Sequence, residues 1–107
     1  MDTEILVVMT TLPDQASAEQ TARLLVEIGA AACVSLFAPC TSIYRWQGEV
    51  ETSSEIPLMI KTTREAYPML EQRLKECHPY ELPEILAIPI AAGLPGYLQW
   101  VIRETDL

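Results

Sequence analysis

Residues 33–63 read CVSLFAPCTSIYRWQGEVETSSEIPLMIKTT, and this stretch decides the fold. On either side of Gln47-Gly48, β-branched and aromatic residues are frequent, and the glycine suits a tight turn with positive φ. The pattern predicts a β-hairpin whose arms each run for about 15 residues and span about 50 Å at ~3.3 Å per residue. Because a compact domain of this length has a radius of gyration of about 13 Å, the tip of the hairpin must project.

The projecting tip carries four apolar or aromatic side chains, namely Ile43, Tyr44, Trp46 and Val50. An isolated hairpin is marginally stable in water, and apolar side chains gathered on a surface mark contacts with another molecule. We therefore expect these four residues to form an interface between subunits. The sequence thus predicts an oligomer.

Two prolines interrupt the hairpin at one level. If the turn sets the register, Pro39 lies opposite Ile56 and Pro57 lies opposite Ala38. Proline has no backbone N–H and is tolerated in strands at edges and bulges. The prolines therefore predict a bend between an inner half, built into the domain, and an outer half, offered to partners. In the inner half, residues 56, 58 and 60 share one face by alternation, and this face is expected to be core.

The order of the remaining elements predicts the fold class. Apolar runs indicate buried strands, and helical spacing with capping residues indicates helices. The expected elements are a strand at 5–9, a helix from Asp14 or Ser17 to Gly29, a helix from near Tyr67 to Pro79, a strand at 85–90 and a helix opened by Leu94-Pro95. With the hairpin, this order predicts an α+β, ferredoxin-like split β-α-β sandwich with an added C-terminal helix.

Three burial expectations accompany this fold. Cys77 shares one side of the second helix with Leu70 and Leu74, and Tyr97 belongs to the buried side of the last helix. The strand at 85–90 lies at the edge of the sheet. Because that strand is apolar on both faces, it needs cover from the C-terminal helix or from a neighbouring subunit.

Length and composition limit the protein class. With 107 residues, half of them hydrophobic, the chain holds one core, so residues 1–107 are expected to form a single domain. The chain has three cysteines, an odd number, which argues against a disulfide framework. It also shows no signal-peptide pattern and no 18-residue apolar run, so we expect a cytoplasmic protein without membrane partners. The formal net charge of −8 disfavours binding to nucleic acid.

The segment CHPYELPE, residues 77–84, concentrates the groups that could carry chemistry. Cysteine and histidine are the preferred ligands of copper and zinc, so Cys77 and His78, with Glu81 and Glu84, are candidate metal ligands. Adjacent side chains cannot surround an ion, and a further donor such as Cys33 is needed. The competing interpretation is that Cys77 is a buried helix-end residue, His78 caps the helix and the glutamates are solvated.

Other candidates have equally simple alternatives. Cys33 and Cys40 have opposite parity on a strand, so they share a face only if Pro39 produces a bulge. Tyr44 and Trp46 share a face that could stack on a flat ligand, although subunit contacts are the commoner use of such residues. No hydrolase, zinc-protease or P-loop motif is present, and we expect no enzyme activity.

Several motifs together resemble the CutA divalent-cation tolerance family. They are CVS at 33–35, TSIYRWQG at 41–48, EIPLMIKTT at 55–63, HPYELPEI at 78–85 and YLQW at 97–100. The resemblance covers nearly the whole chain and implies a homotrimer with crossing hairpins, similar to PII signalling proteins. It also implies a role in tolerance of copper and other divalent cations, with copper binding attributed to positions that fall on Cys33 and His78. A thiol at position 77, where some members have a second histidine, would favour Cu(I).

Three hypotheses stay open at this point, in the following order. The first is a cytoplasmic metal-binding protein, with copper as the favoured metal and Cys33, Cys77, His78, Glu81 and Glu84 as ligands. The second is a PII-like signalling module that binds a small ligand between subunits through Tyr44, Trp46, Glu55, Lys61 and His78. The third is an enzyme with Lys61, His78 and Glu84 as acid-base candidates.

Overall fold

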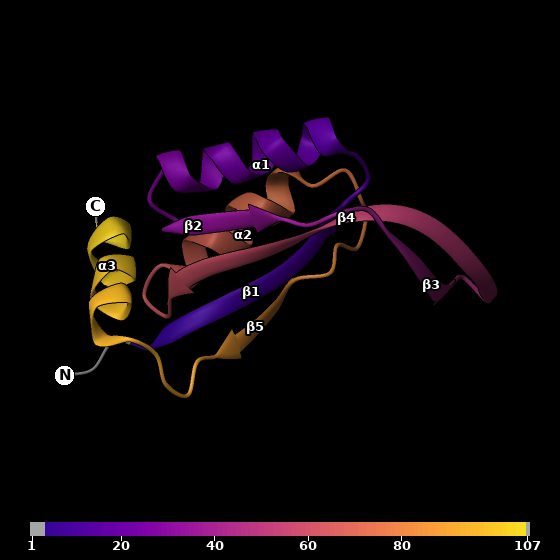
Figure 1. Cartoon of the computed structure of the whole chain (residues 1–107). Coiled ribbons are helices and arrows are strands. Elements are labelled where there is room, and N and C mark those ends of the chain that lie inside the picture. Colours follow the sequence, from indigo (N-terminus) through magenta and orange to yellow (C-terminus); the bar gives the residue numbers. More distant parts are fainter. Residues whose placement is uncertain (1–3, 107) are drawn as a thin grey trace.

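The structure, a computed structural model, describes residues 4–106. Within this range the chain forms an antiparallel sheet, two helices that pack together on one of its faces, and a third helix beyond one end (Figure 1). The elements are β1 (Ile5–Leu12), α1 (Gln15–Glu27), β2 (Cys33–Leu36), β3 (Cys40–Trp46), β4 (Glu49–Thr63), α2 (Tyr67–Cys77), β5 (Leu86–Pro89) and α3 (Pro95–Thr105). The predicted α+β element order is confirmed. None of the helices described here is long and apolar enough to cross a membrane.

The sheet follows the order β2-β4-β1-β5, with β3 continuing along β4 into the projecting hairpin. Alternate residues of β1 and β4 point into one core beneath α1 and α2. The largest fully buried side chains of that core are Val8, Leu12, Leu25, Leu58, Ile60, Leu70 and Leu74. The predicted core face of the inner hairpin is therefore confirmed. Burial of apolar surface on this face is the main force that holds the helices to the sheet.

Asp14 caps α1, which decides between the two predicted caps. Its Oδ1 accepts a hydrogen bond from the Ser17 N–H at 2.8 Å, and this bond to a backbone donor lowers the pKa of the Asp14 carboxyl. At the other end, Gly29 takes a left-handed conformation with φ +75°. That conformation is cheap for glycine, so the helix ends where the sequence predicts.

The hairpin projects from the domain as predicted. β3 and β4 pair from Cys40↔Glu55 to Trp46↔Glu49, and the turn has φ 50° at Gln47 and 82° at Gly48. The molecule is 46 Å along its longest axis against 26 Å and 23 Å across, and Figure 1 shows the hairpin extending away from the helices. Positive φ at both central residues gives the strand twist that tight hairpins need.

A one-residue bulge forms the bend between the two halves of the hairpin. β2 pairs with β4 in the register Leu36↔Leu58, whereas β3 pairs in the register Cys40↔Glu55, so the first arm holds one extra residue. Residues 37–39, with the first proline, form no strand. The bulge places Cys33 and Cys40 on one face of the sheet, but about 20 Å apart along it.

Two burial expectations are wrong, and of the two covers predicted for the edge strand the C-terminal helix is excluded. Cys77 is exposed, because it is the last residue of α2 and the chain turns away there. Tyr97 is 40% exposed, because α3 buries Val101 most deeply while Tyr97 lies against Trp100 in a tilted ring contact. The helix α3 packs near Ile5 and not over β5, so it leaves Leu86 and Ile88 of that edge strand more than half exposed.

Candidate functional site

A cleft of about 740 Å³ lies between the base of the hairpin and the loop after α2. Figure 1 shows the segment between α2 and β5 passing beside the hairpin base. The lining residues are Thr11, Ser42, Ile43, Tyr44, Arg45, Trp46, Glu55, Pro79, Tyr80, Glu81, Leu82 and Glu84. The volume lies in the range of small-molecule sites, about 300–1,000 Å³.

The alternation of the hairpin decides which side chains share the face toward the loop. Tyr44 and Trp46 have the same parity, and the strand register adds Glu55 to their face of the hairpin. The Tyr44 hydroxyl shares a 2.8 Å hydrogen bond with the Ser53 hydroxyl, which holds the phenol along the strand pair. The hairpin therefore presents two aromatic rings and a carboxylate to the cleft.

Glu55 is the most unusual of these groups, because it is a carboxylate that is only 8% exposed. The Thr11 hydroxyl donates a hydrogen bond to Oε2 of Glu55 at 3.1 Å. Burial and, second, the neighbouring Glu55 carboxylate raise the pKa of Tyr80 to about 12, so this phenol keeps its proton. Among the described residues, no ion pair involves Glu55. Its near neighbours are thus neutral hydroxyl groups.

His78 joins the loop to the sheet behind the cleft. Its Nε2 lies 2.7 Å from the Thr11 carbonyl oxygen, and its Nδ1 lies 3.1 Å from the Tyr80 backbone nitrogen. A carbonyl only accepts and a backbone N–H only donates, so Nε2 carries the proton and Nδ1 accepts. The ring also lies against Tyr80, with 4.8 Å between ring centroids. Both nitrogens of this buried imidazole are therefore engaged by the backbone.

The five predicted metal ligands do not gather at one point. Among residues 4–106, no three His, Cys, Asp or Glu side chains lie close enough to hold an ion together. Cys77, Glu81 and Glu84 are exposed around the loop, while Cys33 lies half-buried on β2. A metal at these residues would need donors from elsewhere.

Lys61 lies away from the cleft. Its Nζ is 3.2 Å from the Ser35 hydroxyl and 4.0 Å from the Cys33 thiol, six residues along β4 from Glu55. Of the predicted ligand-binding set, the structure therefore brings Tyr44, Trp46 and Glu55 together, places His78 behind them and separates Lys61.

The predicted interface residues divide between the two faces of the hairpin. Ile43 and Val50 are 71% and 64% exposed, and they lie on the face opposite Tyr44 and Trp46. Tyr44 and Trp46 thus share their face with Glu55, whereas Ile43, which also borders the cleft, and Val50 present apolar surface on the other face.

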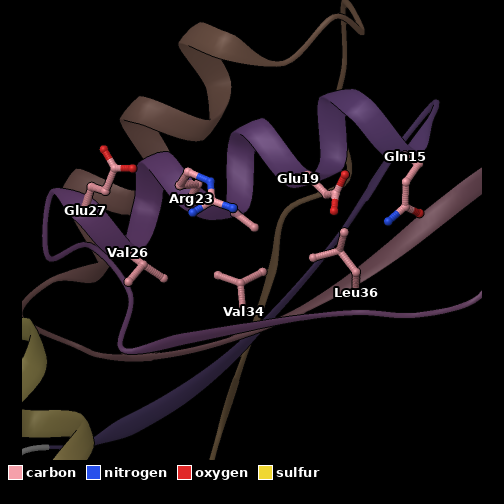
Figure 2. Close-up of a pocket in the computed structure, with 8 residues that line it drawn as sticks. Gln15, Glu19, Arg23, Val26, Glu27, Val34 and Leu36 are labelled. Carbon is pink, nitrogen blue, oxygen red and sulfur yellow. The ribbon is translucent and has the colours of Figure 1, made fainter.

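A second hollow, of about 530 Å³, lies between α1 and the edge strand β2. Figure 2 shows Val34 and Leu36 pointing from β2 toward the helix, with Glu19 and Arg23 on the helix side. None of the residues predicted to bind metal or ligand lines it.

Comparison with known proteins assigns the family. The family model described as CutA1 divalent ion tolerance protein matches residues 6–104. The chain belongs to this family. The CutA1 relatives include the divalent-cation tolerance protein CutA of Thermus thermophilus, 48% identical over 99 residues, which are 92% of this chain and 96% of that protein. Their names describe a tolerance protein and not an enzyme.

Two further relatives extend the comparison. The mouse protein CutA is 43% identical over 96 residues, and the match covers 90% of this chain but only 54% of the longer mouse protein. The crystal structure of CutA from Xylella fastidiosa superposes with a TM-score of 0.93 at 43% identity, covering 95% of this chain and 98% of that one. The CutA1 fold therefore extends over nearly the whole chain.

Two residues of the cleft were not singled out from the sequence for this role. The apolar run predicts a strand that ends at residue 9, before Thr11, whereas β1 continues to Leu12. Tyr80 lies within the loop segment at 77–84, where the sequence pattern gives it no separate role. Its position two residues after His78 was the available signal, since an ordered loop fixes both side chains.

Proposed function

We propose that this chain serves in tolerance of divalent cations as a cytoplasmic homotrimer that binds metal, with copper as the first candidate. The observation that carries the proposal is the 48% identity, over nearly the full length of both chains, to a protein named for divalent-cation tolerance. The role is one of binding rather than catalysis.

The exposed apolar surface supports assembly. Ile43 and Val50 on the hairpin, and Leu86 and Ile88 on the edge strand β5, are each more than half exposed in the single chain. Exposed apolar edge strands invite pairing with another chain. In the trimer that we propose, with PII-like crossing hairpins, neighbouring copies cover both surfaces.

The exposed thiol of Cys77 is the anchor of the proposed metal site. Glu81 and Glu84 follow on the same loop, and Cys33 and His78 are the other candidate donors. Because the described part of one chain gathers no three donors, the site is completed by a neighbouring subunit. A bond from metal to His78 further requires that one ring nitrogen leave its backbone partner. Thiolate ligands favour Cu(I) over harder ions.

Competition against a Cu(I) chelator tests the proposal. We expect reduced wild-type protein to bind about one ion per chain or one per trimer, and Cys77→Ser to lose this binding while it remains a trimer. Cys40→Ser is the matched control, since Cys40 is a free cysteine outside the set of proposed donors, and it should bind as wild type does. Unchanged copper affinity in Cys77→Ser would move the site away from this loop. Cell fractionation tests the cytoplasmic location.

A second candidate function is favoured by the cleft itself. A concave site that combines Tyr44, Trp46 and Glu55 is suited to a small ligand, and a PII-like module would transmit its binding to the subunit contacts. A ligand-dependent change in hydrogen exchange at the hairpin of the trimer would support signalling.

A further inference from the structure

The buried carboxylate of Glu55 lacks a cationic partner in the described chain. An ionised carboxylate loses much of its hydration on burial, and neutral hydrogen bonds replace only part of it. Glu55 is 8% exposed, accepts from the Thr11 hydroxyl at 3.1 Å and forms no ion pair with residues 4–106. A buried carboxylate of this kind is stabilised further when a positive charge binds next to it.

Among residues 4–106, no cationic side chain forms an ion pair with Glu55. Lys61 is held at the other end of β4, 3.2 Å from the Ser35 hydroxyl. Arg45 lines the cleft without forming an ion pair to Glu55, and the exposed Glu81 and Glu84 add negative charge at the rim. The side chains that line the cleft therefore have a net negative charge, which favours binding of a cationic ligand from solution.

The walls of the cleft are aromatic. Tyr44 and Trp46 face it from the hairpin, and Tyr80 faces it from the loop. The negative faces of aromatic rings attract organic cations, and quaternary ammonium groups are bound in this way in aromatic cages. Tyr80 is held in place by His78, through its backbone N–H and by ring contact.

A bare metal ion does not fit these groups. Glu55, Glu81 and Glu84 all line the cleft, yet no set of three possible ligands among residues 4–106 comes close enough to share an ion. A volume of about 740 Å³ also far exceeds that of an ion and suits a small molecule.

We propose that the cleft binds a small organic cation, with an alkylammonium group placed on Glu55 and enclosed by the rings of Tyr44, Trp46 and Tyr80. This inference rests on the second candidate function, whose ligand it assigns to a chemical class. The proposed copper site is anchored at Cys77 and shares only Glu81 and Glu84, at the rim, with this cleft.

The proposal is tested by measuring, with isothermal titration calorimetry on the full-length oligomer, the affinities for choline and for its uncharged isostere, 3,3-dimethylbutan-1-ol. We expect choline to bind and the isostere to bind at least about tenfold more weakly, because only choline carries the charge that Glu55 attracts. Glu55→Gln should lower choline affinity by about tenfold or more, while Glu104→Gln, an exposed carboxylate on α3, should leave it unchanged.

A second variant guards against misfolding of Glu55→Gln. Trp46→Leu changes a partly exposed ring at the cleft and should weaken choline by several-fold, with the circular dichroism spectrum unchanged. Equal binding of choline and its isostere, or wild-type affinity in Glu55→Gln, would overturn the proposal. So would a structure of the oligomer with a neighbouring subunit's guanidinium on Glu55. Choline binding that leaves hydrogen exchange at the hairpin unchanged would support the site and refute the signalling role.

Discussion

Replacing His78 tests whether this imidazole is a structural link between the loop and the sheet. His78→Ala removes the donor to the Thr11 carbonyl and the acceptor of the Tyr80 N–H, two bonds of 2.7 Å and 3.1 Å. It also empties the space of a side chain that is only 8% exposed. If His78 is such a link, His78→Ala should lower the stability of metal-free protein as well.

The expected loss follows from these contacts. A buried polar group left without a partner costs about 1–3 kcal/mol, and the partly exposed Tyr80 N–H lies at the lower end because water can reach it. With the cavity added, we expect His78→Ala to lower the free energy of unfolding by about 3 kcal/mol. His78→Asn places an oxygen near the Nδ1 position and keeps the Tyr80 bond, so it should lose about half as much.

Urea denaturation with excess EDTA, at one fixed chain concentration, measures these differences, since stability of an oligomer depends on concentration. Lys75→Ala, on the exposed side of α2, is the control and should stay within about 0.5 kcal/mol of wild type. The structural role is refuted if His78→Ala matches Lys75→Ala without metal and differs only when copper is present, because His78 would then be a ligand first.

The hairpin turn, the subunit contact and the cleft phenol give three more tests. In Gly48→Ala the added Cβ meets no atom within 4 Å, but the backbone there has φ +82°, which is unfavourable for alanine. The free energy of unfolding, measured in urea, should therefore fall by about 1 kcal/mol. Gly96→Ala, where the Cβ is equally unobstructed and the residue lies inside α3, should raise it slightly. Val50→Asp places a charge on the exposed apolar face of the hairpin and should lower the mass seen by light scattering below that of wild type; an unchanged mass would remove this face from the interface. Tyr80 has a pKa raised to about 12 from its ordinary 10.0, so its neutral form stabilises the folded state below pH 10 and this contribution is lost between pH 10 and pH 12. Tyr80→Phe should flatten that part of the stability profile, and an unchanged profile would contradict the burial of this phenol.

The hairpin was predictable because its determinants are local. Gln47-Gly48 sets the register of the outer half, and the two prolines mark the bend, which the structure resolves as a one-residue bulge. Strand alternation then separates Ile43 and Val50 from Tyr44 and Trp46. The interface prediction grouped these four residues by their apolar character, whereas the alternation rule assigns them to opposite faces of the hairpin.

The cleft was not predictable in the same way, because its contacts join distant parts of the chain. His78 meets Thr11 across 67 residues, and Glu55 meets Thr11 across 44. The hydrophobic pattern of a sequence indicates which residues are buried, but it does not identify the hydrogen-bond partner of a buried polar group. Family membership likewise identifies the fold but leaves the metal ligands and the occupant of the cleft to experiment.

Light scattering combined with metal analysis of one chromatographic peak tests the proposed metal-binding trimer most directly. Reduced protein is loaded with Cu(I), passed over a chelating column and measured for mass and copper together. We predict a particle of about 36 kDa, three times the 12.0 kDa chain, that retains about one copper per chain or one per trimer. A particle of this mass without copper above background would contradict metal binding, and a stable 12.0 kDa monomer would contradict the assembly on which the site depends.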